Sequence, residues 1–399
     1  DETSQIFSPT PLPARDPRGY VCRHGLGYTV WEHEHAGLQT TLSVFVAVDA
    51  PVKLLLLKLA NRSGRARKLS VTGYVEWVLG ESREATAPHV VTEIDPQTAA
   101  ILAHNYYSVD FADRVAFFQA SELTRSVTGD RGEFLGRNGS PAQPAALGRA
   151  RLSGRVGATL DPCAAIQTPL ELADGEEREV VFILGAARSV GEATALIQRF
   201  QGVSDARRTL EKVWNHWNHA LSAIYLETPD AALNVMANGW LLYQTLACRF
   251  WGRSGYYQSG GAFGYRDQLQ DSLALIYSAG HLTRDHLLRC AGRQFREGDV
   301  QHWWHPPTGR GVRTHISDDY LWLPFVATHY VQSTGATGVL DEVVGFLTDR
   351  PVAADEESFY SQPQAADERA TLYEHCRRAI EHGFARGRHG LPLMQAGDW

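Results

Sequence analysis

The spacing of the apolar residues changes near residue 189, and this change constrains the fold more than any other feature of the chain. Before it, apolar and polar residues alternate in short runs separated by Gly, Asp and Pro, which is typical of β-strands. From Asp230 onward the apolar residues recur every three or four positions, which is typical of amphipathic helices. One such helical face contains Leu233, Met236, Trp240, Tyr243 and Ala247. The sequence therefore predicts an α+β multidomain protein with its strands first and its helices second.

The strand-like runs favour a large antiparallel sandwich, because many short strands are joined by turn residues. Residues 52–60 and 69–78 flank the turn Asn61-Arg62-Ser63-Gly64, and this arrangement predicts a β-hairpin. Residues 128–148 are rich in Gly and Pro, so we expect an exposed loop there. The other predicted strands are residues 40–48, 90–94, 99–104, 114–120 and 178–184.

The helical part begins with a recognisable start signal. Ser189 is followed three residues later by Glu192, the spacing of a capping box, and Ser204 is a second candidate N-cap. We therefore expect a β domain over residues 1–188, a helical connector over 189–228, and an all-helical domain over 229–399. Pro324 requires that its helix begin close before it. The helices expected in the last segment cover residues 267–279, 283–297, 320–334, 338–347 and 367–386.

Composition narrows the classes of partner and location. The net charge is −7 over 399 residues, which offers no electrostatic basis for binding nucleic acid. No apolar run approaches the length of a bilayer span, so no membrane segment is expected. The five cysteines are widely spaced and form no C-x-x-C pair, which favours free thiols in a reducing compartment and a cytoplasmic location. The stretch His33-Glu34-His35 alternates along a strand and is interpreted as surface.

The first candidate site is residues 255–271, where four glycines are interleaved with aromatic residues before a charged helix start. Glycine allows a close approach of the backbone to a ligand, and aromatic rings offer flat faces with polar tips. This combination suits a sugar. Arg266 and Asp267 stand at the helix start, and Asp267 shares a helix face with Asp271. The alternatives are a Gly-rich connection before an ordinary helix, and two carboxylates exposed to solvent.

A second candidate site is a predicted loop, residues 298–314, which combines Trp, His and Arg and includes His302, Trp303 and Arg313. Exposed indoles are unfavourable unless they meet a ligand or a packed neighbour, so packing in the core is the alternative. His302 and His305 lie three residues apart, but no third ligand is evident and no metal is expected.

Two more stretches contain acids that belong with the candidate sites. Asp319 lies in Ser317-Asp318-Asp319 at a predicted helix start, where Ser317 or Asp318 is a candidate N-cap. Residues 389–399 end in Asp398 and Trp399, an acid beside an aromatic ring.

These stretches together resemble the inverting glycoside phosphorylases of glycoside hydrolase family 94. The resemblance is strongest at residues 263–271 (Phe-Gly-Tyr-Arg-Asp-Gln-Leu-Gln-Asp), 317–323, and 390–399 with the ending Gly-Asp-Trp. The N-terminal half is similar to the C-terminal phosphorylase-like region of cyclic β-1,2-glucan synthases. The segments that show this similarity are residues 8–13, 23–25, 61–65, 74–80 and 91–95.

The resemblance implies a β-supersandwich, a helical linker and the first part of an (α/α)6 barrel, in a homodimer. It implies inverting phosphorolysis of β-1,2-glucan to α-glucose 1-phosphate, or chain-length control within a cyclic β-1,2-glucan synthase. Inorganic phosphate would be the co-substrate, and no cofactor is implied. The alternatives are a non-catalytic carbohydrate-binding fragment and an inverting hydrolase of the same architecture.

The resemblance also assigns expected roles to the candidate residues. Arg266 and Asp267 would hold the glucose at the non-reducing end, and Trp399 would line the subsite of the cleaved bond. The family's general acid is the second Asp of an Asp-Trp-Asn-Asp motif, so it is expected two residues after Trp399, and the 399-residue chain is expected to be inactive alone. The other expected substrate contacts are His302, Trp303 and Arg313 on the acceptor side, together with Asp271, Asp319 and Asp398.

Overall fold

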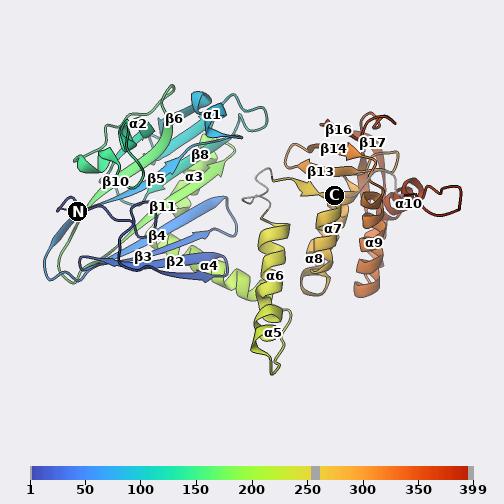
Figure 1. The fold of residues 1–399 in the computed structure, drawn as a ribbon, viewed down its shortest axis with the longest axis horizontal. Coiled ribbons are helices and arrows are strands. Elements are labelled where there is room, and N and C mark those ends of the chain that lie inside the picture. Colours follow the sequence, from blue (N-terminus) through green and yellow to red (C-terminus); the bar gives the residue numbers. More distant parts are fainter. Residues whose placement is uncertain (1, 253–260, 394–399) are drawn as a thin grey trace. The chain divides into compact units, whose positions relative to one another are not determined.

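The computed structural model describes residues 2–252 and 261–393, and the chain divides into two compact units, Asp1–Trp217 and Asn218–Trp399 (Figure 1). Each unit has its own buried apolar cluster. The first unit contains most of the β-strands, and the second contains a group of longer helices with short strands. The predicted order, an antiparallel sandwich followed by a helical region, is confirmed.

The first unit is a sandwich of two antiparallel sheets. Its larger sheet has eight strands in the order β1-β2-β3-β4-β11-β8-β7-β6, and its smaller sheet has the order β5-β10-β9. These strands are β1 (Val21–Gly25), β2 (Tyr28–His35), β3 (Leu38–Val46), β4 (Val52–Asn61), β5 (Arg67–Glu76), β6 (Val90–Ile94), β7 (Ile101–Asn105), β8 (Val115–Ala120), β9 (Ser126–Asp130), β10 (Pro162–Leu172) and β11 (Glu177–Ala187).

The core of the sandwich lies between the two sheets and is built from the inward side chains of both. Phe118 and Phe182 of the larger sheet pack in one cluster with Val127 and Ile166 of the smaller sheet. Gly73 in β5 faces the two Phe rings, and a Cβ there would lie 2.5 Å from the ring of Phe182. Glycine at this position therefore lets the sheets approach closely.

The predicted hairpin over residues 52–78 is wrong, because β4 and β5 lie in different sheets. Asn61 ends β4 and is fully buried, and its side-chain N–H groups donate to the carbonyl oxygens of Arg65, Leu172 and Ala173. Its Oδ1 accepts from the backbone N–H of Ser63 at 3.1 Å. The turn therefore carries the chain from one sheet to the other.

The segment 128–148 is an exposed loop only over residues 137–143, and the rest of it differs from the prediction. It contains the end of β9, the helix α2 (Arg131–Leu135) and the 3-10 turn η2 (Ala145–Gly148). Phe134 and Leu135 are buried in a small cluster with Ala165 of β10. These apolar residues cover the outer face of the smaller sheet.

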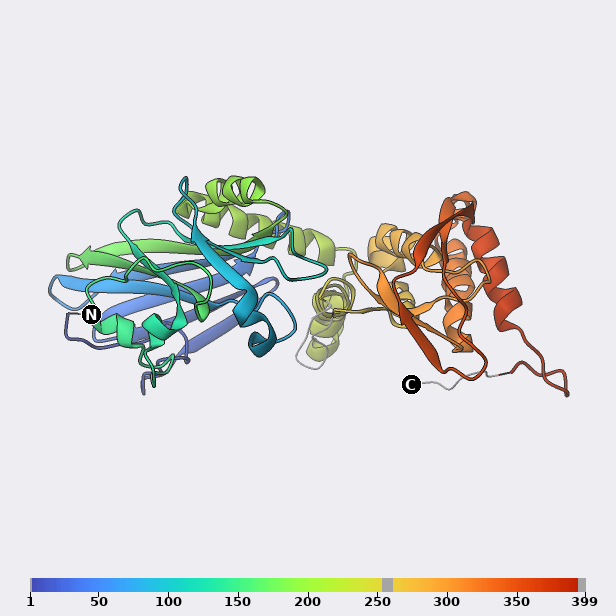
Figure 2. The same ribbon diagram turned by 90° about the horizontal axis from the view of Figure 1, so that it is seen from above.

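Two helices follow the sandwich, α3 (Val190–Phe200) and α4 (Val203–Leu221). The Ser189 hydroxyl accepts from the backbone N–H of Glu192, so the predicted cap is confirmed. Ser204 lies inside the first turn of α4 rather than before it, because α4 begins at Val203. Helix α3 packs against β11 and β8 (Figure 2).

The second unit contains both helices and strands, so the prediction of an all-helical domain is wrong in detail. Strands β13, β14 and β16 lie at one end of helices α7, α8 and α9 (Figure 1). The helical elements are α5 (Ala231–Val235), η3 (Met236–Trp240), α6 (Leu241–Gln244), η4 (Thr245–Phe250), α7 (Tyr265–Leu273), α8 (Ile276–Ala291), α9 (Ser317–Thr334), η5 (Thr337–Asp341) and α10 (Leu372–Gly383), and the strands are β12 (Phe263–Gly264), β13 (Gln301–His305), β14 (Arg310–Thr314), β15 (Val343–Thr348), β16 (Ser358–Ser361) and β17 (Gln364–Thr371).

Three local predictions in this unit differ from the structure. The helix expected over 338–347 is a 3-10 turn followed by strand β15, and the loop expected over 298–314 is the β13–β14 hairpin. Pro324 lies eight positions into α9, not at its start, and the helix continues past it. No helix in the ranges 2–252 and 261–393 is long and apolar enough to cross a membrane.

Candidate active site

Three elements of the second unit bring charged side chains together. The first turns of α7 and α9 and the strand β13 together form two pairs. Arg266 of α7 forms an ion pair with Asp318 of α9, with Nη1 and Oδ2 2.8 Å apart. His302 of β13 contacts Asp319 of α9, with Nδ1 and Oδ2 2.8 Å apart. The two neighbouring acids of α9 thus reach two different elements.

The acids of this cluster stand where helices favour negative charge. Asp267 lies in the first turn of α7, and Asp318 and Asp319 lie in the first turn of α9. The unpaired N–H groups of a helix start give it partial positive charge, which stabilises nearby carboxylates. Neither Ser317 nor Asp318 is the N-cap, because Ile316 occupies that position and no side-chain cap bond forms. The predicted caps are therefore wrong. The side chains of Asp318 and Asp319 instead contact residues on α7 and β13.

Arg266 is held between an acid and an aromatic ring. Its side chain is 23% exposed, and its guanidinium lies over the ring of Trp322 at 5.9 Å from the centroid. A guanidinium presents five N–H donors in one plane, which suits recognition of several oxygen atoms at once. The Arg266 head is therefore fixed in direction and still reaches solvent.

Asp267 folds back over the start of its own helix. Gly264 is the N-cap residue of α7, and a Cβ on it would lie 2.5 Å from Asp267 Oδ2. The missing side chain at Gly264 therefore leaves the space that the carboxylate occupies. Asp267 also lies near enough to His302 to favour the charged form of its ring.

The His302–Asp319 pair is buried. Asp319 is 1% exposed, and its Oδ1 has no hydrogen-bond partner among the residues that the structure describes. Burial raises the pKa of Asp319, although its hydrogen bond with His302 acts in the opposite direction. Burial would lower the pKa of His302, but the bond to Asp319 and the nearby carboxylates outweigh it and raise that pKa overall.

A β-bulge directs His302 toward α9. Gln301 pairs with Arg313 and Trp303 pairs with Val312, so His302 is the extra residue between two consecutive pairs. A bulge turns a side chain away from the direction that strict alternation would give it. This local irregularity is what brings His302 to Asp319.

The two tryptophans of β13 have different environments. Trp304 is 1% exposed and packs near the rings of Phe263 and Tyr265, so it belongs to the core. Trp303 is half-buried, and its ring lies 5.7 Å from that of Tyr360 on β16. Trp303 therefore keeps an accessible aromatic surface. Trp304 instead packs in the core, which is the alternative that the sequence left open.

Arg313 is bound inside the second unit, which contradicts its predicted role as a sugar contact. It is 2% exposed, and its Nε and Nη2 donate to the two carboxylate oxygens of Asp299 at 2.5 and 2.7 Å. Its Nη1 donates to the carbonyl oxygen of Arg350 at 2.9 Å, and its plane lies over Phe295. Nε, Nη1 and Nη2 of the guanidinium therefore all donate to partners inside the second unit.

Asp271 pairs with Arg249 of η4, with Oδ2 and Nε 3.0 Å apart. Asp398, Trp399 and residues 255–260 of the glycine-rich stretch lie outside the described residues. The sequence did not single out Trp322 or the pairing role of Asp318. The only signal for them was two adjacent acids and a tryptophan in one predicted helix start.

The comparisons with known proteins agree with this architecture. Residues 1–203 match the family model for the supersandwich domain of glycosyl hydrolase 94, and residues 216–399 match the model for the catalytic domain of the glycosyl hydrolase 94 superfamily. The chain belongs to glycosyl hydrolase family 94. The predicted resemblance is confirmed. The cluster of Arg266, His302, Asp318 and Asp319 lies in the segment that matches the catalytic domain.

Curated relatives of this family 94 chain include a synthase and phosphorylases. The chain is 42% identical over 390 residues to the cyclic beta-(1,2)-glucan synthase NdvB of Rhizobium meliloti (strain 1021), covering 97% of this chain and 14% of NdvB. It is 25% identical over 435 residues to the N,N'-diacetylchitobiose phosphorylase of Vibrio furnissii, covering all of this chain and 52% of that protein. It is 27% identical over 406 residues to the solabiose phosphorylase of Paenibacillus borealis, covering all of this chain and 49% of that protein. The chain thus spans about half the length of these phosphorylases and a smaller share of NdvB.

Proposed function

We propose that the protein carrying this chain acts on β-1,2-glucan, either by phosphorolysis to α-glucose 1-phosphate or by controlling chain length within a cyclic β-1,2-glucan synthase. The observation that carries the proposal is the meeting of Arg266, Asp318, Asp319 and His302 at the starts of α7 and α9. An oriented guanidinium, carboxylates and a neighbouring indole are the groups that recognise the hydroxyls and flat faces of a sugar.

The cluster would bind the terminal glucose by its hydroxyl groups. Arg266 would donate to sugar oxygens, and Asp267 would accept from sugar hydroxyls at the start of α7. Asp318 and Trp322 would hold the guanidinium in the direction seen in the structure. The buried Asp319 would hold the ring of His302 in place through the 2.8 Å contact between its Oδ2 and His302 Nδ1.

In the proposed reaction a phosphate oxygen forms a bond to the anomeric carbon from the face opposite the leaving group. The glycosidic bond breaks, and a proton passes to the leaving oxygen from a general acid. An inverting hydrolase needs a carboxylate to activate water, whereas phosphate is already an anion and needs no base. Cationic and hydroxyl donors would hold the phosphate in line.

The choice of the β-1,2 linkage rests on the pattern of similarity. The chain is 42% identical to a cyclic beta-(1,2)-glucan synthase, and 24–27% identical to phosphorylases whose names give other sugars. Those phosphorylase relatives support phosphate as the co-substrate. The homodimer implied by the family resemblance stays a prediction.

The test is to incubate the full-length protein with linear β-1,2-glucan, with and without inorganic phosphate, and to measure glucose 1-phosphate and free glucose. We expect glucose 1-phosphate only when phosphate is present, and little release from β-1,3- and β-1,4-glucans of equal length. Free glucose formed without phosphate would instead identify a hydrolase.

The design includes two matched variants. Asp319→Asn should abolish release, while Asp285→Asn, which alters an exposed carboxylate paired with Arg284 on α8, should leave it unchanged. Absence of any product from every β-glucan in the unaltered protein would contradict the proposal.

A further inference from the structure

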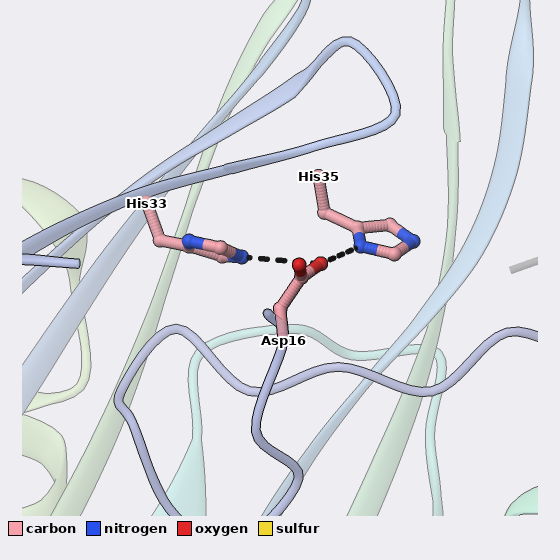
Figure 3. Close-up of side chains that lie close together, drawn as sticks. All are labelled: Asp16, His33 and His35. Carbon is pink, nitrogen blue, oxygen red and sulfur yellow. Dashed lines mark hydrogen bonds and ion pairs between the residues drawn. The ribbon is translucent and has the colours of Figure 1, made fainter. Parts of the chain in front are cut away.

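Three side chains of the sandwich unit meet at one point that the proposed glucan activity does not use. His33 and His35 lie two positions apart on β2, so both imidazoles project from the same face of the sheet. Asp16 comes from the segment before β1, and its carboxylate lies between the two rings (Figure 3). One ligand atom from each residue lies within 4.8 Å of the others. The interpretation of His33 as a surface residue is therefore wrong, since its side chain is fully buried.

The hydrogen bonds of His33 show which ring nitrogen carries the proton. Its Nδ1 lies 3.1 Å from the carbonyl oxygen of Gly19, which can only accept, so Nδ1 holds a hydrogen. In the neutral ring the lone pair is then on Nε2. This buried Nε2 has no hydrogen-bond partner among residues 2–252 and 261–393, and it points at Asp16 Oδ2 from 3.6 Å. A lone pair facing a carboxylate is unfavourable, so either a proton or a metal ion must lie between the two atoms.

The ring of His35 faces the same carboxylate. Its Nε2 lies 2.8 Å from the side-chain oxygen of Gln5. Its Nδ1 faces Nη2 of Arg18 at 3.3 Å and, much closer, Oδ2 of Asp16. Without a metal, a proton must lie between Nδ1 and that carboxylate oxygen, and a bound cation would take its place. Both imidazoles thus turn a ring nitrogen toward one carboxylate oxygen.

Asp16 is set up as an anionic ligand. Its Oδ1 accepts from the backbone N–H of Arg18 at 2.9 Å, while Oδ2 faces the two rings. Oδ1 is thus held by the backbone, and Oδ2 is the oxygen available to a cation.

We propose that Asp16, His33 and His35 bind a single zinc ion that fastens the N-terminal segment to strand β2. Two imidazole nitrogens, one carboxylate oxygen and a water molecule make a tetrahedral ligand set that zinc accepts. Zinc bonds of about 2.0 Å separate tetrahedral ligand atoms by roughly 3.3 Å, close to the 3.6 Å between His33 Nε2 and Asp16 Oδ2. The Asp16–His35 contact would have to open to admit the ion.

The surroundings support a structural ion. Metal-binding histidines usually donate their second N–H to an oxygen, as His33 does to Gly19 and His35 does to Gln5. The ring of Tyr20 stacks on His33 at 4.0 Å between centroids, and that of Phe7 stacks on His35 at 4.4 Å. The ligand side chains are 0%, 13% and 4% exposed for His33, His35 and Asp16, so little room remains for a substrate.

The ligand types favour zinc over the hard cations. Calcium and magnesium prefer oxygen ligands and larger coordination numbers, whereas two imidazoles select a transition metal or zinc. Arg18 is the competing cation, because its half-exposed side chain contacts both Asp16 and His35. The ion would displace that guanidinium into solvent.

The experiment measures zinc binding to the 399-residue chain after removal of metal with a chelator. Calorimetry should show one zinc ion per chain, and the melting temperature should rise with zinc. His33→Gln and Asp16→Asn should each weaken zinc binding by more than about 100-fold. Changes outside the coordination sphere already weaken binding by up to about that much, and a lost ligand should cost more. His104→Gln alters another buried His, which pairs with the half-exposed carboxylate of Glu93, and should leave zinc binding unchanged.

A separate control is needed because Cys22 and His24 are exposed neighbours on β1, with Sγ and Nε2 3.4 Å apart. Cys22→Ser should keep zinc binding, and zinc X-ray absorption should show nitrogen and oxygen ligands without sulfur. Arg18→Gln retains all three ligands and should bind zinc more tightly. An unaltered chain that binds no zinc, binding that persists in His33→Gln, or unchanged affinity in Arg18→Gln would each overturn the site.

Discussion

The ring nitrogen Nδ1 of His302 lies 2.8 Å from Oδ2 of Asp319, and this bond joins the bulge of β13 to the first turn of α9. The two residues are 17 positions apart in the sequence, yet both side chains are buried. The bond therefore sets the position of the α9 start, where Asp318 meets Arg266. The two pairs therefore form one connected group of side chains at the proposed glucose site.

Replacing His302 by Gln should reduce stability in a pH-dependent way. The folded-state pKa of His302 is raised, so its contribution is fully present below its unfolded pKa and is lost as pH rises through the folded pKa. Near pH 6 the variant should lose about 1.5–3 kcal/mol, as for a hydrogen bond between charged groups. Urea unfolding at several pH values between 6 and 9 should show this difference shrinking as pH rises. His305→Gln is the matched control, and a difference that grows with pH would contradict the assignment.

Asp267→Asn in the full-length protein should abolish sugar turnover and leave thermal unfolding nearly unchanged. The carboxylate sits at the start of α7 in the space left by Gly264, and the amide has almost the same shape. Activity assays and calorimetric melting of the same preparation separate the two effects. A large fall in melting temperature would assign Asp267 a structural role.

Arg266→Gln should weaken sugar binding by about tenfold or more, since a charged hydrogen bond contributes about 1.5–3 kcal/mol. The change removes the guanidinium that lies between Asp318 and Trp322. Calorimetry with β-1,2-glucooligosaccharides measures the affinity directly. Arg284→Gln removes another Arg that pairs with acids, on α8, and should have no effect. Equal affinity in both variants would show that Arg266 does not contact the sugar.

Arg313→Met should destabilise the second unit by about 3–5 kcal/mol, because Asp299 would remain charged in a buried place. The double variant Arg313→Met with Asp299→Asn should recover part of the loss. Arg350→Met removes a half-exposed pair with Glu356 and should change stability little. Chemical unfolding monitored by tryptophan fluorescence gives the free energy of unfolding of each of these three variants. If Arg313→Met unfolded like the unaltered chain, its buried ion pair would be unimportant.

Local signals in the sequence were sufficient where the structure depends on neighbouring residues. Alternation predicted strands at residues 52–60, 90–94 and 178–184, and the Ser189 hydroxyl caps α3 as its spacing with Glu192 indicated. The motif around Arg266 and Asp267 located a helix start and led to the correct family. These features depend on periodicity and capping, which act within one strand or one helical turn.

Distant contacts decided the rest. Asn61 sends the chain between sheets because its amide bonds to carbonyls more than a hundred residues away, so the turn sequence alone resembled a hairpin. Arg313 and Trp303 lie in the same hairpin, yet one is buried against Asp299 and the other keeps an accessible face.

Periodicity and motifs predicted a β-sandwich before a helical region, the family, and the acids that begin α7 and α9. Only folding shows that His302 meets Asp319, that Arg266 meets Asp318, and that Asp16 joins His33 and His35. Periodicity records which face of an element is apolar. It does not record which side chain from another element will complete a buried charge or hydrogen bond.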